Sequence, residues 1–231
     1  MKNLPDLRSC RWYFLGLLVL LITCVLSLTM YSKSACFIAL NTYHPYGLNV
    51  FFINYTFIGD GIFALMLTAL IYFYFKRKQE GVAMLISFII SGLAVQIMKN
   101  RINSPRPKLF FEAGQYLHFI DGVSLANNSS FPSGHTASAF AIATVLVIMM
   151  GNKTGHLFIL LAAALVGYSR IYLAQHFLLD VFIGIIIGTV SGILSVYLAM
   201  NLKEIKASVR KIQNSKTNNN LLRSPAAVQT T

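Results

Sequence analysis

Residues 12–31 read WYFLGLLVLLITCVLSLTMY and contain no charged side chain. An apolar run of about 20 residues is long enough to cross the hydrocarbon core of a bilayer as one helix. Arg11 and Lys33 bracket the run, and aromatic residues stand at both of its ends, as is common at membrane interfaces. The run is long for a signal peptide and no clear cleavage site follows it. We therefore expect a retained first transmembrane helix.

The rest of the chain also consists largely of apolar segments. Hydrophobic residues make up 56% of the 231 residues and charged residues only 11%, with a mean hydropathy of +0.64. A soluble domain would carry roughly 25% charged residues. This composition predicts an all-α, polytopic membrane protein with six transmembrane helices. The five further spans are expected at residues 58–75, 82–98, 136–150, 157–168 and 178–200.

The segments between and after the spans determine the expected domain organisation. Residues 33–58 are rich in aromatic residues and asparagine and are expected to form a loop. Residues 1–200 are short enough to form a single six-helix membrane domain. Residues 201–231 are basic and then rich in Asn and Ser, which predicts a surface-lying helix and then a largely disordered cytoplasmic tail. The three cysteines are too few and too scattered for a disulfide framework or a metal site.

The distribution of lysine and arginine predicts the orientation in the membrane. With six spans, 13 of the 19 lysines and arginines fall on the side of the two termini and six on the opposite side. Because cytoplasmic loops carry the excess of these residues, the termini are expected in the cytoplasm. The net charge of +12 is then explained by topology and by attraction to anionic lipid. No nucleic-acid-binding module is recognisable, so nucleic acid is not an expected partner.

Three short polar clusters fall on the expected outer face, and the last of them is Ser169-Arg170-x5-His176-x3-Asp180. His176 and Asp180 are four residues apart, so on a helix they would share one face. A carboxylate in that position can accept the Nδ1–H of the imidazole and leave Nε2 as a nucleophile. The alternative is an interfacial histidine beside an aspartate that merely starts a helix. Taken alone, the pair favours this second interpretation. An ionisable residue that enters an apolar segment is costly and usually functional, which is an argument for the first.

The second cluster, Pro132-Ser133-Gly134-His135, stands where the fourth span begins. The N–H groups at a helix N-terminus attract anions, and Gly134 lets the backbone approach an oxyanion closely. Ser133 can donate a hydroxyl hydrogen bond, and His135 is placed to protonate a leaving oxygen as a general acid. Taken alone, the tetrapeptide could equally be an ordinary capping turn.

The cations of the first and third clusters are Lys99, Arg106 and Arg170, and the first cluster reads Lys99-x6-Arg106-Pro107. The transition state of phosphoryl transfer spreads charge over three oxygens, which fixed cations stabilise. Arginine also binds phosphate in a bidentate manner. For Lys99 alone, a lysine that extends from a helix end to the interface is the simpler interpretation. Arg101 and Lys108 are interpreted as loop cations.

Together, the order, spacing and membrane side of the three clusters resemble the type 2 phosphatidic acid phosphatase superfamily of membrane lipid phosphatases. The resemblance covers about residues 55–200. It implies that His176 forms a phosphohistidine intermediate, that Asp180 orients His176 and that His135 acts as the acid. It also implies that no metal and no other cofactor is needed, which fits a sequence without a carboxylate cluster suited to Mg²⁺. It assigns phosphate binding to five residues: Lys99, Arg106, Ser133, Gly134 and Arg170.

The expected function is therefore the removal of a terminal phosphate or pyrophosphate from a membrane lipid. The resemblance offers lipid A, undecaprenyl pyrophosphate, phosphatidylglycerophosphate and phosphatidic acid as candidate substrates. The short single-domain build suggests a bacterial inner-membrane enzyme whose active site faces the periplasm. A lipid phosphotransferase would use the same residues. An anion transporter is an alternative of another class, although the spans contain no broken-helix pairs and no internal repeat.

Two features stay open at the level of sequence. Asp60, in Gly59-Asp60-Gly61, either touches the site or caps a helix. The loop of residues 108–131, which includes Asn127-Asn128-Ser129-Ser130, is expected to form a lid or a rim around the head group, but its contacts are not readable. The sequence indicates neither the lipid tail nor the oligomeric state.

Overall fold

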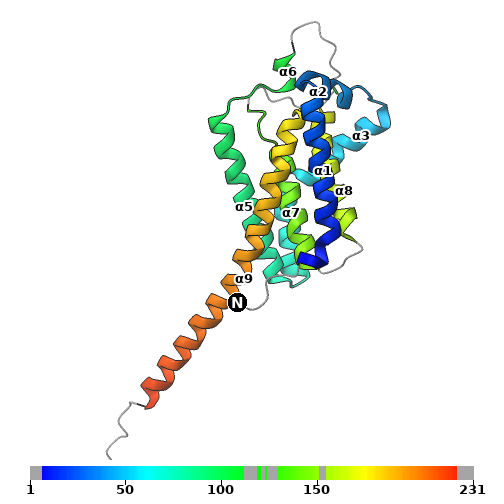
Figure 1. The fold of residues 1–231 in the computed structure, drawn as a ribbon. Coiled ribbons are helices and arrows are strands. Elements are labelled where there is room, and N and C mark those ends of the chain that lie inside the picture. Colours follow the sequence, from blue (N-terminus) through cyan, green and yellow to red (C-terminus); the bar gives the residue numbers. More distant parts are fainter. Residues whose placement is uncertain (1–6, 112–118, 121–122, 124–128, 151–154, 223–231) are drawn as a thin grey trace, which may run out of the picture.

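The computed structural model describes residues 7–111, 119–120, 123, 129–150 and 155–222. Over these residues the chain is helical and forms no strand, which confirms the predicted all-α class. The long helices stand side by side as a bundle, and the shorter α2, α3 and α6 gather at one end of it (Figure 1). In chain order the elements are η1 (Leu7–Cys10), α1 (Arg11–Met30), α2 (Lys33–Asn41), α3 (Tyr46–Tyr55), η2 (Thr56–Gly59), α4 (Gly61–Ala69), η3 (Leu70–Tyr74), α5 (Lys78–Arg101), α6 (Pro107–Phe110), α7 (Gly134–Met150), α8 (His156–Tyr172) and α9 (Leu178–Leu222).

Three of the described helices are long and apolar enough to cross a membrane: α1, α5 and the first part of α9, residues 178–201. A fourth candidate is the pair formed by Tyr46–Gly59 and Gly61–Tyr74, which is bent by 60°. This pair corrects the expectation that the spans contain no broken-helix pair. The remaining apolar helices, α7 and α8, have 17 residues each. The helices thus fall where the spans were predicted, while the count of six crossings stays a prediction.

Helix α7 lies at the centre of the bundle, where it packs against α5, α8 and α9. Every residue from 136 to 145 is buried. Helix α9 meets it with three glycines spaced by four residues, Gly184, Gly188 and Gly192. A Cβ atom added at Gly188 would lie 2.4 Å from the carbonyl oxygen of Ala137, so only glycine allows this contact. Small residues at such spacing let two helices approach backbone to backbone.

Helices α2 and α3 correct the expectation of a loop over residues 33–58. Ser32 caps α2, because its Oγ accepts the N–H of Ala35 at 3.2 Å. Asn41, at the other end of α2, donates to the carbonyl oxygens of Ile171 and Tyr172 at 2.9 and 2.8 Å. The polar residues that suggested a loop therefore cap a short helix and tie it to the end of α8.

Two helices extend further than expected. The fifth span was expected to end at residue 168, but α8 runs to Tyr172, so Ser169 and Arg170 lie in its last turn. Helix α9 continues to Leu222 through part of the expected tail and projects from the bundle (Figure 1). Residues 201–222 contain no glycine or proline, so nothing in the sequence interrupts the helix. The division into a membrane domain and a tail stays a prediction.

Candidate active site

The three polar clusters meet at the end of the bundle that carries α6, around a cavity of about 470 Å³. Six of the eight predicted site residues line it: Lys99, Arg106, Gly134, His135, Arg170 and His176. The other two, Ser133 and Asp180, are buried, with 0% and 1% of their surface exposed. Six further residues complete the lining: Ile53, Thr56, Asp60, Val123, Leu173 and Gln175. The structure therefore brings together residues that lie up to about 120 positions apart in the sequence.

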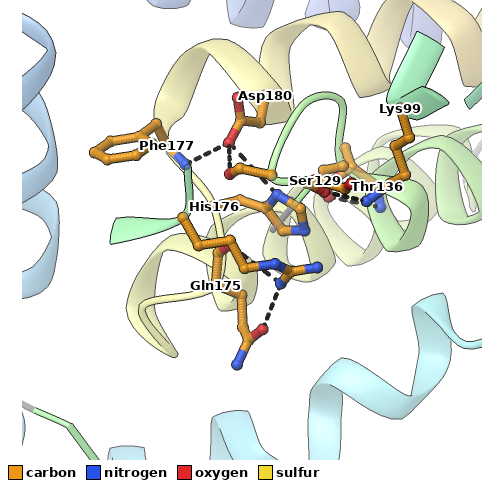
Figure 2. A network of polar contacts seen from close by, with 10 residues as sticks. Lys99, Ser129, Thr136, Gln175, His176, Phe177 and Asp180 are labelled. Carbon is orange, nitrogen blue, oxygen red and sulfur yellow. Dashed lines mark hydrogen bonds and ion pairs between the residues drawn. The ribbon is translucent and has the colours of Figure 1, made fainter. Parts of the chain in front are cut away.

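His176 lies in the turn between α8 and α9, two residues before α9 begins. This corrects the expectation that His176 and Asp180 share one helical face, because only Asp180 is in the helix. The two side chains still face each other: Nδ1 of His176 lies 3.5 Å from Oδ2 of Asp180, which is longer than a typical hydrogen bond (Figure 2). Burial lowers the pKa of His176, so its ring is neutral near pH 7. With the proton on Nδ1, toward Asp180, Nε2 keeps its lone pair.

Asp180 is held by groups from both sides of the site (Figure 2). Its Oδ2 accepts the backbone N–H of Phe177 at 2.9 Å and a short hydrogen bond from the hydroxyl of Ser130. Its carbonyl oxygen accepts the backbone N–H of Ser133 at 3.0 Å. Asp180 therefore links the segment before α7 to the start of α9, and it places the second and third clusters next to each other.

The second cluster forms the start of α7, with Gly134 and His135 as the first helical residues. Ser133 caps this helix: its Oγ lies 3.4 Å from the N–H of Thr136 and 2.8 Å from the Thr136 hydroxyl. The hydroxyl that was expected to bind phosphate is thus buried in the cap, and its predicted role stays a prediction. Because Gly134 and His135 line the cavity, a phosphate bound there would face the positive end of α7.

The three predicted cations come from three separate segments, the end of α5, the residue before α6 and the end of α8, and each donates a hydrogen bond to an identified acceptor. Lys99, in the last turn of α5, donates to the carbonyl oxygen of Ser129 at 2.6 Å (Figure 2). Arg106 donates to the Gln175 side chain at 2.6 Å and to its carbonyl oxygen at 3.3 Å. Burial lowers the pKa of Arg106, but arginine remains a cation in proteins.

Arg170, in the last turn of α8, donates from Nη1 to the hydroxyl of Thr56 in η2 at 2.6 Å. Its side chain is almost fully buried, and its Nε has no hydrogen-bond partner in the described part of the chain. A buried guanidinium with an unused donor at the edge of a cavity is suited to an anionic ligand. The three cations give the cavity a positive field with two histidines inside it.

The sequence left two roles open for Asp60, a helix cap and a contact with the site, and the structure shows both. Its Oδ1 caps α4 by accepting the N–H of Ile62 at 2.8 Å. Its Oδ2 lies 3.8 Å from Nε2 of His135 at the wall of the cavity. A carboxylate that faces a histidine from a separate element was not predicted, because nothing in the spacing of residues 60 and 135 links them.

The structure also identifies residues that the sequence interpretation missed or placed wrongly. Ser129 and Ser130 were expected in a lid or rim, but they contact Lys99 and Asp180 inside the site. Thr56 and Gln175 hold cations and carry no recognisable signal in the sequence. Of the loop predicted to surround the head group, residues 112–118, 121–122 and 124–128 lie outside the described residues. In the described part of the chain no group of three or more His, Cys, Asp or Glu could hold a metal, and metal independence stays a prediction.

Comparisons with known proteins agree with this site. The model of the PAP2 superfamily matches residues 80–204, which is more than half of the chain. Lipid phosphate phosphatase 1 of Arabidopsis thaliana is 30% identical over 161 residues, which cover 55% of this chain and 49% of that protein. The chain thus spans about half the length of this relative.

Two solved structures are similar in fold. The crystal structure of LpxE from Aquifex aeolicus has a TM-score of 0.60 and 34% identity, covering 70% of this chain and 92% of LpxE. A transmembrane PAP2-type phosphatidylglycerolphosphate phosphatase from Bacillus subtilis has a TM-score of 0.58 and 25% identity, covering 85% of this chain and 96% of that one. The family match covers the helices that carry all three clusters, as the resemblance of those clusters predicted, and this chain belongs to the PAP2 superfamily.

Proposed function

We propose that this protein is a metal-independent lipid phosphatase that removes a terminal phosphate or pyrophosphate from a membrane lipid. One observation carries the proposal: a neutral His176 backed by Asp180 shares a single cavity with His135 and three cations. A nucleophile, a candidate acid and a positive field are the groups that phosphoryl transfer through a covalent intermediate requires. Family membership supports the same chemistry.

The proposed reaction has two steps. Nε2 of His176 attacks phosphorus, the bond from phosphorus to the leaving oxygen breaks, and His135 gives its proton to that oxygen. Water then attacks the phosphorus of the phosphohistidine while His135 takes a proton from the water. The bond from phosphorus to Nε2 of His176 breaks, and inorganic phosphate leaves. Lys99, Arg106 and Arg170 neutralise the phosphoryl oxygens, and the N-terminal residues of α7 face the same charge. Asp180 keeps the His176 proton on Nδ1 throughout.

An apolar hollow favours a lipid over a soluble phosphate ester. A second cavity, of about 150 Å³, is bordered by α4, α7 and α8, the last two of which also line the polar cavity. On α7, Ala139 of the apolar cavity follows His135 of the polar cavity by one turn. An acyl or isoprenyl chain that leaves the phosphate site along α7 would lie on this surface.

The proposed setting is a bacterial inner membrane with six crossings: α1, the bent pair of α3–η2 and α4–η3, α5, α7, α8 and α9. In Figure 1 the start of α1 and the extension of α9 lie at one end of the bundle, and α2 and α6 lie at the other. This arrangement supports the orientation proposed from the cation count, in which the termini are cytoplasmic and the cavity faces the periplasm.

The experiment that tests the proposed function is a phosphate-release panel on the purified protein. It covers phosphatidic acid, phosphatidylglycerophosphate, lipid A and undecaprenyl pyrophosphate. Release of phosphate from at least one of them is expected. Consumption of lipid phosphate with a second lipid phosphorylated, and no free phosphate, would instead indicate a phosphotransferase. No reaction with any substrate would contradict both enzymes.

The panel is repeated in excess EDTA, where we expect unchanged rates because the cations of the site are side chains. Activity that EDTA abolishes and Mg²⁺ restores would contradict the metal-independent mechanism.

A further inference from the structure

The segment Thr56–Asp60 is built tightly against the two elements that carry the acid and one of the cations. Arg170 donates a hydrogen bond to the hydroxyl of Thr56, the first residue of this segment. At its end, a Cβ atom on Gly59 would lie 2.6 Å from Cγ1 of Val166 and 2.9 Å from both Cβ and the carbonyl oxygen of His135. Any larger residue would push the segment away, so the close approach fixes where the next residue, Asp60, stands.

The two oxygens of Asp60 face different ways. Oδ1 accepts the N–H of Ile62 at 2.8 Å and fixes the side chain as the cap of α4. Oδ2 is thereby directed to the wall of the cavity, 3.8 Å from Nε2 of His135. That distance is too long for a hydrogen bond, so the Nε2 proton is not taken up by Asp60 and can point to a substrate.

The surroundings of His135 explain why a carboxylate there matters. The charged or titratable groups around its ring are Asp60, Lys99, Arg106, Arg170 and His176. Except for Asp60, every one of these is a cation or a histidine, and the positive end of α7 lies beneath the ring. The three cations and the helix N-terminus oppose protonation of His135, yet a general acid must carry a proton when the leaving oxygen departs.

We propose that Asp60 is a positioning residue for His135: its carboxylate supplies the negative charge that keeps His135 protonated for departure of the leaving group. The site then contains two histidine–aspartate pairs in which the aspartates have different functions. Asp180 fixes the tautomer of a neutral nucleophile, and Asp60 sustains the charge of an acid. Asp60 acts only through His135 and its neighbour Arg170, whose charge it also feels. This inference rests on the proposed function.

The test is Asp60→Asn, because asparagine caps a helix as well as aspartate does and removes only the charge. Two substrates distinguish a loss of acid catalysis from a purely structural effect. Phosphatidic acid has an alkoxide leaving group that needs a proton, whereas 4-nitrophenyl phosphate has a phenolate that leaves without one. We measure kcat/KM against pH, since it reports formation of the phosphohistidine, and the inhibition constant of inorganic phosphate. Asp60→Glu tests rescue, and Glu80→Gln, at the opposite end of the bundle, is the matched loss of a carboxylate.

For Asp60→Asn we expect kcat/KM for phosphatidic acid to fall about tenfold, and the alkaline limb of its pH profile to move down by about one pH unit. The value for 4-nitrophenyl phosphate should change by less than about twofold, because that reaction needs little acid catalysis. Phosphate inhibition should be unchanged or tighter, since a negative charge has left the cavity. Asp60→Glu should recover part of the loss, and Glu80→Gln should behave as wild type.

An unchanged profile for phosphatidic acid in Asp60→Asn would overturn the inference and leave the proposed function intact. Equal losses for both substrates with weaker phosphate inhibition would also overturn it, because they indicate a purely structural role. A wild-type protein without turnover of any lipid in the phosphate-release panel would overturn the proposed function, and the inference with it.

Discussion

At the scale of single residues, some polar groups of the site hydrogen-bond to the backbone and also contact the side chains that are proposed to react. Asp180 accepts the N–H of Phe177 and the hydroxyl of Ser130, and the same oxygen faces His176. A carboxylate held by two other donors cannot turn away from the imidazole. The imidazole of His176, the proposed nucleophile, is therefore oriented by the fold itself, and its geometry exists before substrate binds.

Replacing the nucleophile gives the most direct prediction at this scale. His176→Ala should reduce phosphate release by about a thousandfold or more, because it removes the imidazole that is proposed to form the covalent intermediate. The protein should still insert into membranes and elute as wild type in size-exclusion chromatography. The matched control is His156→Ala, which removes a buried histidine at the other end of α8. Wild-type turnover in His176→Ala would show that His176 is not the nucleophile.

The pH dependence follows from the burial of His176. Burial lowers its folded-state pKa below the usual value of about 6.5, so the ring becomes protonated, and stops being a nucleophile, only at a lower pH. We expect the acidic limb of kcat/KM to lie below about pH 6.5. Because a phosphate monoester itself ionises near about pH 6, the limb is measured with two esters of different second pKa. An acidic limb that shifts with the second pKa of the ester would contradict this assignment. So would an acidic limb at or above the ordinary histidine pKa.

Sequence alone predicted the residues of the site better than their contacts. The eight candidates converge because residue type and order reveal chemistry, and six of them line one cavity. The sequence could not show that Ser133 uses its hydroxyl to cap α7, or that His176 lies outside the helix that carries Asp180. Such contacts depend on where a helix begins, and a shift of two residues changes which side chains face each other.

At the scale of elements, the pairing of α7 with α9 places His135, the proposed acid, near His176, the proposed nucleophile. Gly184, Gly188 and Gly192 follow Asp180 at intervals of four, so the face of α9 that carries the carboxylate also meets α7. A Cβ at Gly184 would lie 2.8 Å from the carbonyl oxygen of Ser133, the residue before α7. The distance between the second and third clusters is thus determined by helix packing deep in the bundle.

This packing predicts opposite effects for the same substitution at two glycines. Alanine usually stabilises a helix relative to glycine by about 0.5–1 kcal/mol. Gly92→Ala in α5, where nothing lies within 4 Å, should therefore keep or slightly raise the melting temperature in detergent. Gly188→Ala should lower it and reduce turnover, at a cost of about 1–3 kcal/mol, because the methyl group meets the Ala137 carbonyl and the first turn of α7 moves away. Equal melting temperatures for the two variants would contradict the proposed close contact.

The elements differ in how visible they are in the sequence. Long apolar runs predicted α1, α5, α7, α8 and α9 because burial in lipid leaves a strong compositional pattern. The four-residue η2 and the short α2 and α3 have no such pattern, and their polar residues suggested a loop. The glycines of α9 were a readable signal that the sequence interpretation did not use.

At the scale of the whole molecule, the positions of the cations and of the cavity support the proposed orientation in the membrane. Helix α6 lies at the end of the bundle opposite the start of α1 and the extension of α9 (Figure 1). The cavity is lined at this α6 end by Lys99 from the last turn of α5, His135 from the start of α7 and Arg170 from the last turn of α8. According to the sequence, most lysines and arginines outside the site fall at the end with the start of α1 and the extension of α9. A lipid phosphatase with this arrangement would meet its substrate in the outer leaflet while its basic extension meets the inner one.

The orientation is testable by labelling single cysteines in intact cells with a membrane-impermeant maleimide. The native Cys10, Cys24 and Cys36 are buried, so background labelling should be low. Lys108→Cys, in α6 near the cavity, should react from outside, whereas Lys78→Cys, at the start of α5, should react only after the cells are opened. A fluorescent reporter fused after Leu222 should fold in the cytoplasm. Both cysteines lie outside the residues that line the cavity, so activity provides the control for folding. External labelling of Lys78→Cys with protection of Lys108→Cys would invert the orientation, and it would place the phosphatase reaction in the cytoplasmic leaflet.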